Sequence, residues 1–246
     1  MNKKGISHIE MIISFVIFLG IVVVIFIFLR PIREPTLSNV VLDIVERGMQ
    51  GEASSTLATI PFKIDETIFA NITFLCFRVA HPLDIDDADP DKLHTSNILL
   101  KKSTNNPLAF DIESDYLEIA EEDPFYSLSF SFTEIFPQEA LGRDYCPLVP
   151  EDKVVFSAPR TETLYSFSKL SQISVDYAEN YNALKGRWFV PSKNDFAIKV
   201  LDAGGNVLFD MPRNVPPRRD VFAREIEGQM LRGTDVERIT INVRVW

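Results

Sequence analysis

One run of residues limits what this chain can fold into more than any other feature. Met11 to Leu29 contains nineteen residues without a charged side chain. Apolar side chains fall on every face of the helix that the run predicts, and no polar stripe divides them, so an ordinary half-exposed surface helix is excluded. Started at Ile6, a helix through Leu29 would be about 36 Å long, against about 30 Å for the hydrocarbon core of a bilayer. We therefore expect a transmembrane α-helix over 6–29, in preference to a helix buried in a soluble domain.

A cleaved secretory signal peptide is the other interpretation of this end of the chain, because Lys3 and Lys4 precede the apolar run. The run is too long for the apolar part of a signal peptide, and no small-x-small cleavage pattern follows it. Cleavage after the helix is therefore not expected. The basic residues on its two sides nearly balance, with Arg30 and Arg33 beyond it, so charge alone does not orient the segment.

The residues that precede the run form a specific pattern: Lys3-Lys4-Gly5-Ile6-Ser7-His8-Ile9-Glu10. This pattern resembles the processing signal of type IV pilins, pseudopilins and their archaeal relatives, and is closest in style to archaeal pilin-like proteins. The resemblance implies a prepilin peptidase that removes the leader 1–5 by cutting after Gly5. Ile6 would become the mature N-terminus, where bacterial members usually have Phe. The resemblance covers only residues 1–30, so the rest of the fold must be inferred from other patterns.

Glu10 needs compensation, because a carboxylate inside an apolar helix costs on the order of 2.5–3.5 kcal/mol at a bilayer centre. Cleavage after Gly5 would create an α-amino group on Ile6, whose ordinary pKa of about 7.7–8.0 leaves it largely charged. Glu10 lies about 6 Å further along the helix. The resemblance implies that it neutralises this amine, or the amine of the next subunit in a filament. The alternative is a carboxylate held at a helix N-terminus by the helix dipole, but this does not account for Gly5 and the two lysines.

The segment after the helix, Arg30-Pro31-Ile32-Arg33-Glu34-Pro35, stops it, because each proline lacks a donor and disfavours helix in the preceding residue. We expect a proline-containing stalk over 30–36 and an extracytoplasmic domain over 37–246. A division into lobes 37–158 and 159–246 is possible. Bacterial pilins continue the first helix into the head, so the stalk again favours the archaeal style.

Apolar spacing in the remaining chain is mostly that of short strands. The final residues alternate cleanly, with Ile239 and Val243 on one face and Arg238 and Thr240 on the other. Helical spacing occurs once clearly, at 170–184, and ambiguously at 37–49. The fold class expected is thus a transmembrane helix plus a β-rich, mainly antiparallel ectodomain, arranged as a sandwich with one inserted helix. The expected strands are 55–62, 67–79, 125–132, 196–201, 207–209, 221–231 and 237–246, and the expected long loops are 81–106 and 111–123.

Two further features bear on an exported domain. Cys76 and Cys146 are the only cysteines, and an even pair outside the cytoplasm can form a disulfide. Two buried free thiols remain the alternative, because distance in space cannot be read from sequence. Asn71-Ile72-Thr73 is an N-glycosylation sequon.

The sequence offers little for catalysis or metal binding. Asp87, Asp89 and Asp91 have the one-three-five spacing of a calcium loop, but Lys92 and Ile98 occupy its glycine and terminal acid positions. A solvated loop is favoured over a calcium site, so we assign no metal. No nucleophile elbow, phosphate loop or dinucleotide fingerprint occurs, and we expect neither a cofactor nor an enzyme. A net charge of −10 argues against binding to nucleic acid.

Two functions fit these observations. In the first, the chain is a type IV pilin-like subunit, of the minor, capping or adhesive kind as readily as a bulk one, whose helix anchors it in a membrane before assembly into a surface filament. Its partners would be the prepilin peptidase, the membrane and other pilin-like subunits. The C-terminal domain would lie outside the cell, and after assembly it would be part of an extracellular filament. In the second, the helix is a permanent anchor and the domain is a cell-surface adhesion module.

Overall fold

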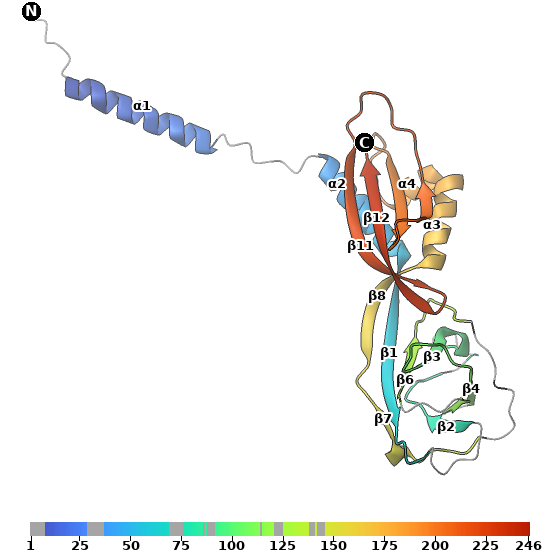
Figure 1. Cartoon of the computed structure of the whole chain (residues 1–246). Coiled ribbons are helices and arrows are strands. Elements are labelled where there is room, and N and C mark those ends of the chain that lie inside the picture. The colour runs from blue at the N-terminus through green and yellow to red at the C-terminus, as the bar shows by residue number, and fades with distance from the viewer. Residues whose placement is uncertain are drawn as a thin grey trace, which may run out of the picture.

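The computed structural model describes residues 8–28, 37–68, 76–85, 87, 92–113, 115–120, 125–137, 141 and 146–246. Its first element is the helix α1 (His8–Phe28), whose side chains are described from 11 to 23. The rest of the described chain forms two lobes, a helical lobe and a β lobe, joined at a narrow waist (Figure 1).

The helical lobe consists of three helices and a four-stranded sheet. The helices cover one face of the sheet, and the other face is open (Figure 1). These four strands are one end of a larger sheet, and the pairs among the four are antiparallel. The elements are α2 (Leu37–Ala53), α3 (Phe167–Glu179), α4 (Tyr181–Arg187), β9 (Phe196–Asp202), β10 (Val207–Met211), β11 (Phe222–Arg232) and β12 (Asp235–Val245).

The core of the helical lobe follows from the periodicity of its elements. In α2, Val41, Val45 and Met49 recur at helical spacing and are wholly buried. In β12, Ile239, Ile241, Val243 and Val245 are buried, as their alternation with polar residues predicts. This core joins residues from both sides of position 158, because α2 packs with elements from the end of the chain.

The β lobe is built from short strands around a separate core. Phe62, Ile98, Leu117 and Leu128 are among the side chains buried in it. The elements are β1 (Ser54–Ile64), β2 (Phe77–Ala80), β3 (Ile98–Lys102), β4 (Phe110–Glu113), β5 (Tyr116–Ile119), β6 (Phe125–Phe130), β7 (Val154–Phe156) and β8 (Arg160–Ser166), with the short 3-10 helices η2 (Thr95–Asn97) and η3 (Glu151–Lys153).

One curled sheet runs through both lobes, in the order β10-β9-β12-β11-β8-β1-β6-β3, and β7 pairs with β1 beside this path. A second sheet, β2-β5-β4, closes the β lobe. The two long strands β1 and β8 pair antiparallel and form the waist between the lobes. β8 meets β11 only at Met230 and Leu231, where the pairing is parallel.

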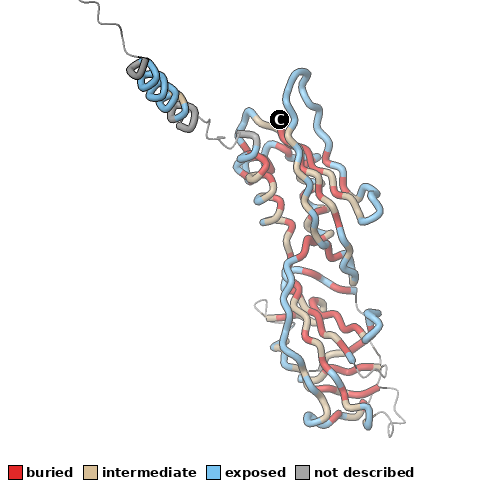
Figure 2. Tube along the Cα trace, turned by 60° about the vertical axis from the view of Figure 1, so that its left-hand side comes forward, coloured by how far each residue is buried: buried red, intermediate tan, exposed pale blue. Residues whose placement is uncertain are grey.

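A small cluster of five apolar residues, which we call the joint cluster, holds the lobes together at the waist. The tip of the β11–β12 hairpin supplies Leu231 to it, and β3 supplies Leu99. Beside it, burial lowers the pKa of Lys101, and the Asp235 carboxylate at the hairpin tip acts in the opposite direction. The cluster consists of Leu57, Leu99, Phe136, Leu164 and Leu231. Figure 2 shows buried residues in both lobes and at this junction.

The structure corrects several expectations about the fold and decides one segment that the sequence left ambiguous. The sheets do not form a sandwich: one sheet spans both lobes and curls, and of the described strands three lie outside it. The single helix expected at 170–184 is two helices, because α3 ends at Glu179 and α4 starts at Tyr181. The ambiguous segment 37–49 is helical. The loops expected at 81–106 and 111–123 contain β3, part of β4, and β5. In 67–79, the described strand is confined to β2.

Candidate functional site

The described part of α1 shows its apolar side chains to solvent on all sides. Ten of its eleven large hydrophobic residues between 11 and 23 have exposed fractions of 48% to 70%, with the highest value at Met11. Val22, the least exposed among 11–23, is of intermediate exposure. Within the described residues, then, the lobes do not bury this helix. The exposed residues are Met11, Ile12, Ile13, Phe15, Val16, Ile17, Phe18, Leu19, Ile21 and Val23.

The structure corrects the interpretation of this helix as a membrane span. Among the helices of the described residues, none has both the length and the apolar character needed to cross a membrane. The expected transmembrane helix over 6–29 is therefore wrong, and so is the single-pass membrane location that rested on it. The alternative function, a permanently anchored surface module, depended on the same span.

The residues of the processing signal lie mostly outside the description. Lys3, Lys4, Gly5 and Ile6 precede the first described residue. Glu10 belongs to the first turn of α1, but its side chain is not described. Cleavage after Gly5 and the assembly role of Glu10 therefore stay predictions.

The two cysteines are joined. Cys76 and Cys146 form a disulfide that closes a sequence separation of 70, with Cα atoms 5.2 Å apart. The segment after Cys146 runs beside β2: the amide of Arg78 donates to the carbonyl of Pro147 (2.8 Å), and the amide of Val149 donates to that of Arg78 (2.9 Å). The disulfide thus fastens this segment to the three-stranded sheet.

The calcium and glycosylation candidates fall largely beyond the described chain. Asn71, Asp89 and Asp91 are not described. Asp87 is described, and its carboxylate accepts hydrogen bonds from the amide (2.6 Å) and the hydroxyl (2.8 Å) of Thr95. It therefore caps the turn η2. Among the described residues, no three His, Cys, Asp or Glu side chains come together as a metal site would need.

A charged cluster in the helical lobe was not foreseen from the sequence. Lys185, one of its buried members, donates to the carbonyl of Ser192 (2.9 Å) and to Asp195 (3.1 Å), which also accepts from the Tyr181 hydroxyl (3.0 Å). Burial alone would raise the pKa of Asp195, but the hydrogen bonds from Lys185 and Tyr181 outweigh it and hold that pKa below its usual range. Arg213 stacks on the Tyr181 ring at 3.7 Å. These contacts fix α4 against β9, which is a structural task.

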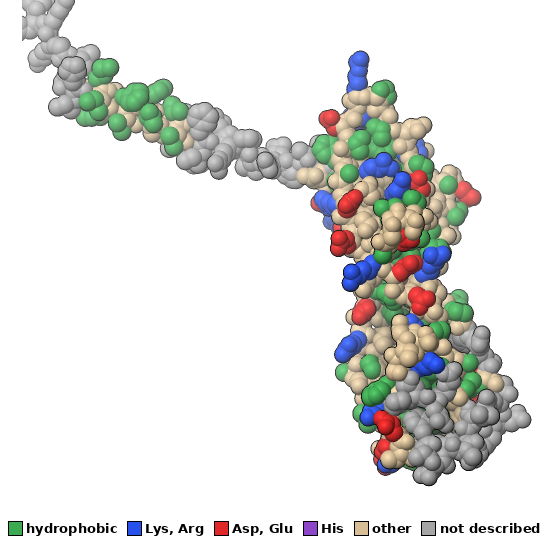
Figure 3. Space-filling view, in the orientation of Figure 1, with side chains coloured by type: hydrophobic (Ala, Val, Ile, Leu, Met, Phe, Trp, Pro, Cys, Tyr) green, Lys and Arg blue, Asp and Glu red, His purple; other side chains and the backbone are tan. Residues whose placement is uncertain are grey.

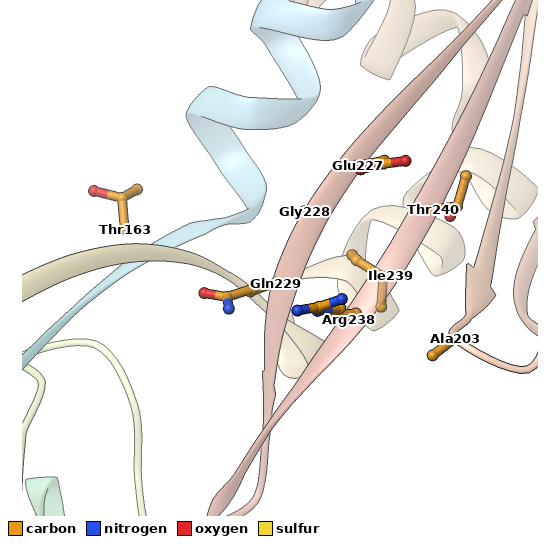
Figure 4. A pocket seen from close by; sticks show the side chains of 8 residues that line it. All are labelled: Thr163, Ala203, Glu227, Gly228, Gln229, Arg238, Ile239 and Thr240. Carbon is orange, nitrogen blue, oxygen red and sulfur yellow. The ribbon is translucent and has the colours of Figure 1, made fainter.

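One hollow is a wide concavity of about 590 Å³ on the open face of the helical lobe (Figure 4). Glu227 stands directly opposite Thr240, and Gln229 opposite Arg238, on the paired strands β11 and β12. The described lining has one acid, Glu227, and one base, Arg238, in keeping with the mixed charges on the surface near the waist (Figure 3). The concavity therefore lacks a dominant charge that would select one ligand. Its lining is Thr163, Ala203, Glu227, Gly228, Gln229, Arg238, Ile239 and Thr240.

A second hollow, of about 360 Å³, lies at the waist, and we call it the waist cleft. Its wall is rich in hydroxyls, and it includes one ammonium group, that of Lys169 in the first turn of α3. Two phenylalanines from the end of β6 and the residues after it complete the lining. The residues are Ser54, Ser55, Thr56, Ala58, Phe130, Ser131, Phe132, Thr133, Thr161 and Lys169.

The polar groups of the waist cleft are held in place by one another. The hydroxyl of Ser55 lies 2.8 Å from that of Thr133 and 3.2 Å from that of Ser131. The Lys169 ammonium donates to the carbonyl of Ser54 (2.6 Å), and Ser166 caps the start of α3 by accepting from the Lys169 amide (3.2 Å). The sequence gives no signal for this site, because its residues come from four separate stretches of chain and share no motif.

Comparison with known proteins adds no relative to this picture: no family model matches the chain, and no curated protein and no solved structure matches it either.

Proposed function

We propose that this chain is a subunit of a type IV pilin-like filament and that α1 is its assembly element. The observation that carries the proposal is the set of ten large apolar side chains, on all sides of α1, that the described lobes leave exposed. The leader-like pattern in front of the helix supports the same assignment. The proposal gives the chain a structural task and no catalytic one.

The exposed area of α1 needs a partner. A soluble protein rarely presents a contiguous apolar surface of more than a few hundred Å², and larger patches mark interaction sites. α1 is apolar on every side over 11–23, so a flat or one-sided partner surface would cover only part of it. A bundle of copies of the same helix surrounds each member. The core of a helical filament has that geometry.

The ends of the helix add register to this packing. The prepilin peptidase, as the processing partner, would release Ile6 as a charged N-terminus. Glu10 follows Ile6 by four positions, which would be about 6 Å along the axis of an ideal helix. In a water-free bundle an isolated carboxylate is costly, so pairing it with the amine of a neighbouring copy favours one stagger between helices over others.

Two measurements test this proposal together. Filaments purified from the source cells are imaged by electron microscopy, and their protein is identified by mass spectrometry of peptides from 36–246 and of the mature N-terminus. We expect filaments that contain this chain with Ile6 as its first residue. A mature chain that begins at Met1, or filaments that never contain it, would rule the proposal out.

A variant pair separates assembly from folding. Glu10→Val should remove the chain from filaments while the disulfide still forms, because both cysteines belong to the β lobe. Glu225→Val is the matched control, since Glu225 is an exposed acid on the open face of β11. Incorporation of both variants at the wild-type level would show that Glu10 has no assembly role.

A further inference from the structure

We propose that the waist cleft is a binding site for an acidic sugar, such as a uronic acid unit of a glycan. The inference does not depend on α1 or on filament assembly, because every residue that carries it lies in 54–58, 130–133, 161 and 169. Four properties of the cleft lead to it: its size, its charge, its hydroxyls and its aromatic wall.

The size and depth of the cleft suit one small molecule. Its volume of about 360 Å³ is in the range of about 300–1,000 Å³ that small-molecule pockets have in proteins. The cleft lies between the two cores, where β1 and β8 run from one lobe to the other. In this two-stranded ribbon of β1 and β8, Thr56 and Thr161 are exposed to solvent.

The charge of the cleft is positive in a chain whose net charge is −10. Lys169 is half-buried, and among the described residues that line the cleft it is the one with a charge, none of the others being Asp or Glu. One of its three N–H donors is used by the Ser54 carbonyl (2.6 Å). Two donors of a fixed ammonium therefore remain for an anionic ligand, and a charge-assisted hydrogen bond to a carboxylate is stronger than a neutral one.

The hydroxyls make the site selective for a ligand that is itself rich in hydroxyls. Ser55 and Ser131 are 3% and 1% exposed, and their contacts with Thr133 fix them within one network. Thr161 is two residues from Thr163, the cross-strand partner of Thr56, so Thr56 and Thr161 share one face of the ribbon. A hydroxyl both donates and accepts, as each hydroxyl of a sugar ring does. A bare anion would leave most of these groups unmatched.

The aromatic wall accounts for the apolar part of the cleft. Phe132 is 66% exposed, an unusual position for a phenylalanine beside a polar network, and Phe130 is half-buried next to it. A sugar ring has an apolar face of C–H groups that packs on an aromatic ring, while its edge carries the hydroxyls. A uronic acid would place its carboxylate on Lys169, its hydroxyls on the Ser and Thr side chains, and its ring face on Phe132.

The test is isothermal titration calorimetry of the full chain, kept in solution with a detergent that contains no sugar. Glucuronate, glucose and inorganic phosphate are the three probes. We expect one glucuronate site per chain, with glucose at least about tenfold weaker because it cannot use the Lys169 charge. Equal affinity for phosphate and glucuronate would overturn the sugar proposal in favour of a plain anion site, and absence of glucuronate binding would overturn it outright.

Variants locate the binding in the cleft. Lys169→Gln should weaken glucuronate about tenfold or more, and Phe132→Ser, at an exposed position that the fold does not need, about three- to tenfold. Lys193→Gln and Phe189→Ser are the matched controls, because both residues are exposed on the helical lobe away from the cleft lining, Phe189 by 85%. Thermal unfolding confirms that each variant is folded. Unchanged affinity in folded Lys169→Gln and Phe132→Ser, or an equal loss in the controls, would refute the site.

Discussion

The indole ring of Trp188 lies directly against Gly48, so closely that a Cβ atom on Gly48 would be 2.5 Å from Cγ of the ring. Trp188 follows α4, and Gly48 is in the middle of α2, so this contact brings the first and the last helix of the lobe together. Only a residue without a side chain permits it.

Gly48→Ala should therefore destabilise the helical lobe by about 1–3 kcal/mol, because the methyl group forces the indole or the helix to move. Gly51→Ala, three residues further in the same helix, meets nothing within 4 Å and should stabilise by up to about 1 kcal/mol through helix propensity. Urea unfolding followed by tryptophan fluorescence measures both. Equal effects of the two substitutions would contradict this packing.

The disulfide should be the main support of the small sheet β2-β5-β4. Closing a separation of 70 residues restricts the unfolded chain, and the loss of a disulfide in a small domain typically costs about 2–5 kcal/mol. Cys76→Ser combined with Cys146→Ser should lower the urea midpoint and expose amides of β2 and β5 to hydrogen exchange, with little change in β12. Uniform exchange across both lobes would show that the disulfide does not act locally.

The joint cluster couples the lobes, and this can be tested at Leu231, which is 3% exposed. Leu231→Ala should cost about 2–4 kcal/mol and separate the unfolding of the two lobes. Fluorescence of Trp188 and Trp246 reports on the helical lobe, and far-ultraviolet circular dichroism reports on both. Coincident transitions by the two probes in this variant would argue against the coupling, and Val236→Ala, at a 42% exposed position nearby, provides the control.

Two tyrosines set an alkaline limit on stability. Burial raises the pKa of Tyr177 and of Tyr181 well above the ordinary value near 10. Above pH 10 the unfolded chain loses these two protons while the folded chain keeps them. The free energy of unfolding is therefore unaffected by the two tyrosines below pH 10, and it falls as the pH rises toward their pKa values in the folded chain. Melting temperatures between pH 8 and 11.5 should show this decline. Tyr177→Phe should make it less steep, and an unchanged slope would contradict the assignment.

The parts of the fold that could be predicted are those whose sequence has one strong period. The strand β12 can be predicted because Ile239, Ile241 and Val243 alternate with polar residues, and the structure pairs it with β11. β8 was missed because Arg160 to Thr163 are all exposed and provide no apolar pattern. The break at Asn180 was missed because Tyr177, Tyr181 and Leu184 keep helical spacing across it.

The two candidate sites also differ in how far the sequence predicts them. The leader pattern is contiguous and was found directly, whereas the waist cleft depends on the pairing of β1 with β6 and β8. Ser55 and Thr133 are 78 positions apart, and Lys169 donates to a carbonyl 115 positions earlier. No local pattern announces such a site. For the apolar run 11–29, in contrast, the sequence predicts more than the structure supports. Its composition indicates a membrane span, and none of the described helices qualifies as one.

Assembly of filaments through α1 is tested most directly by asking whether α1 of one chain contacts α1 of another. The two native cysteines are joined to each other, so Ile17→Cys places a single free thiol on the exposed helix. Purified filaments that contain this variant are treated with a short bismaleimide and analysed on a denaturing gel. We expect a ladder of crosslinked dimers, trimers and larger species. Filaments in which the Ile17→Cys chains remain monomeric would contradict assembly through α1.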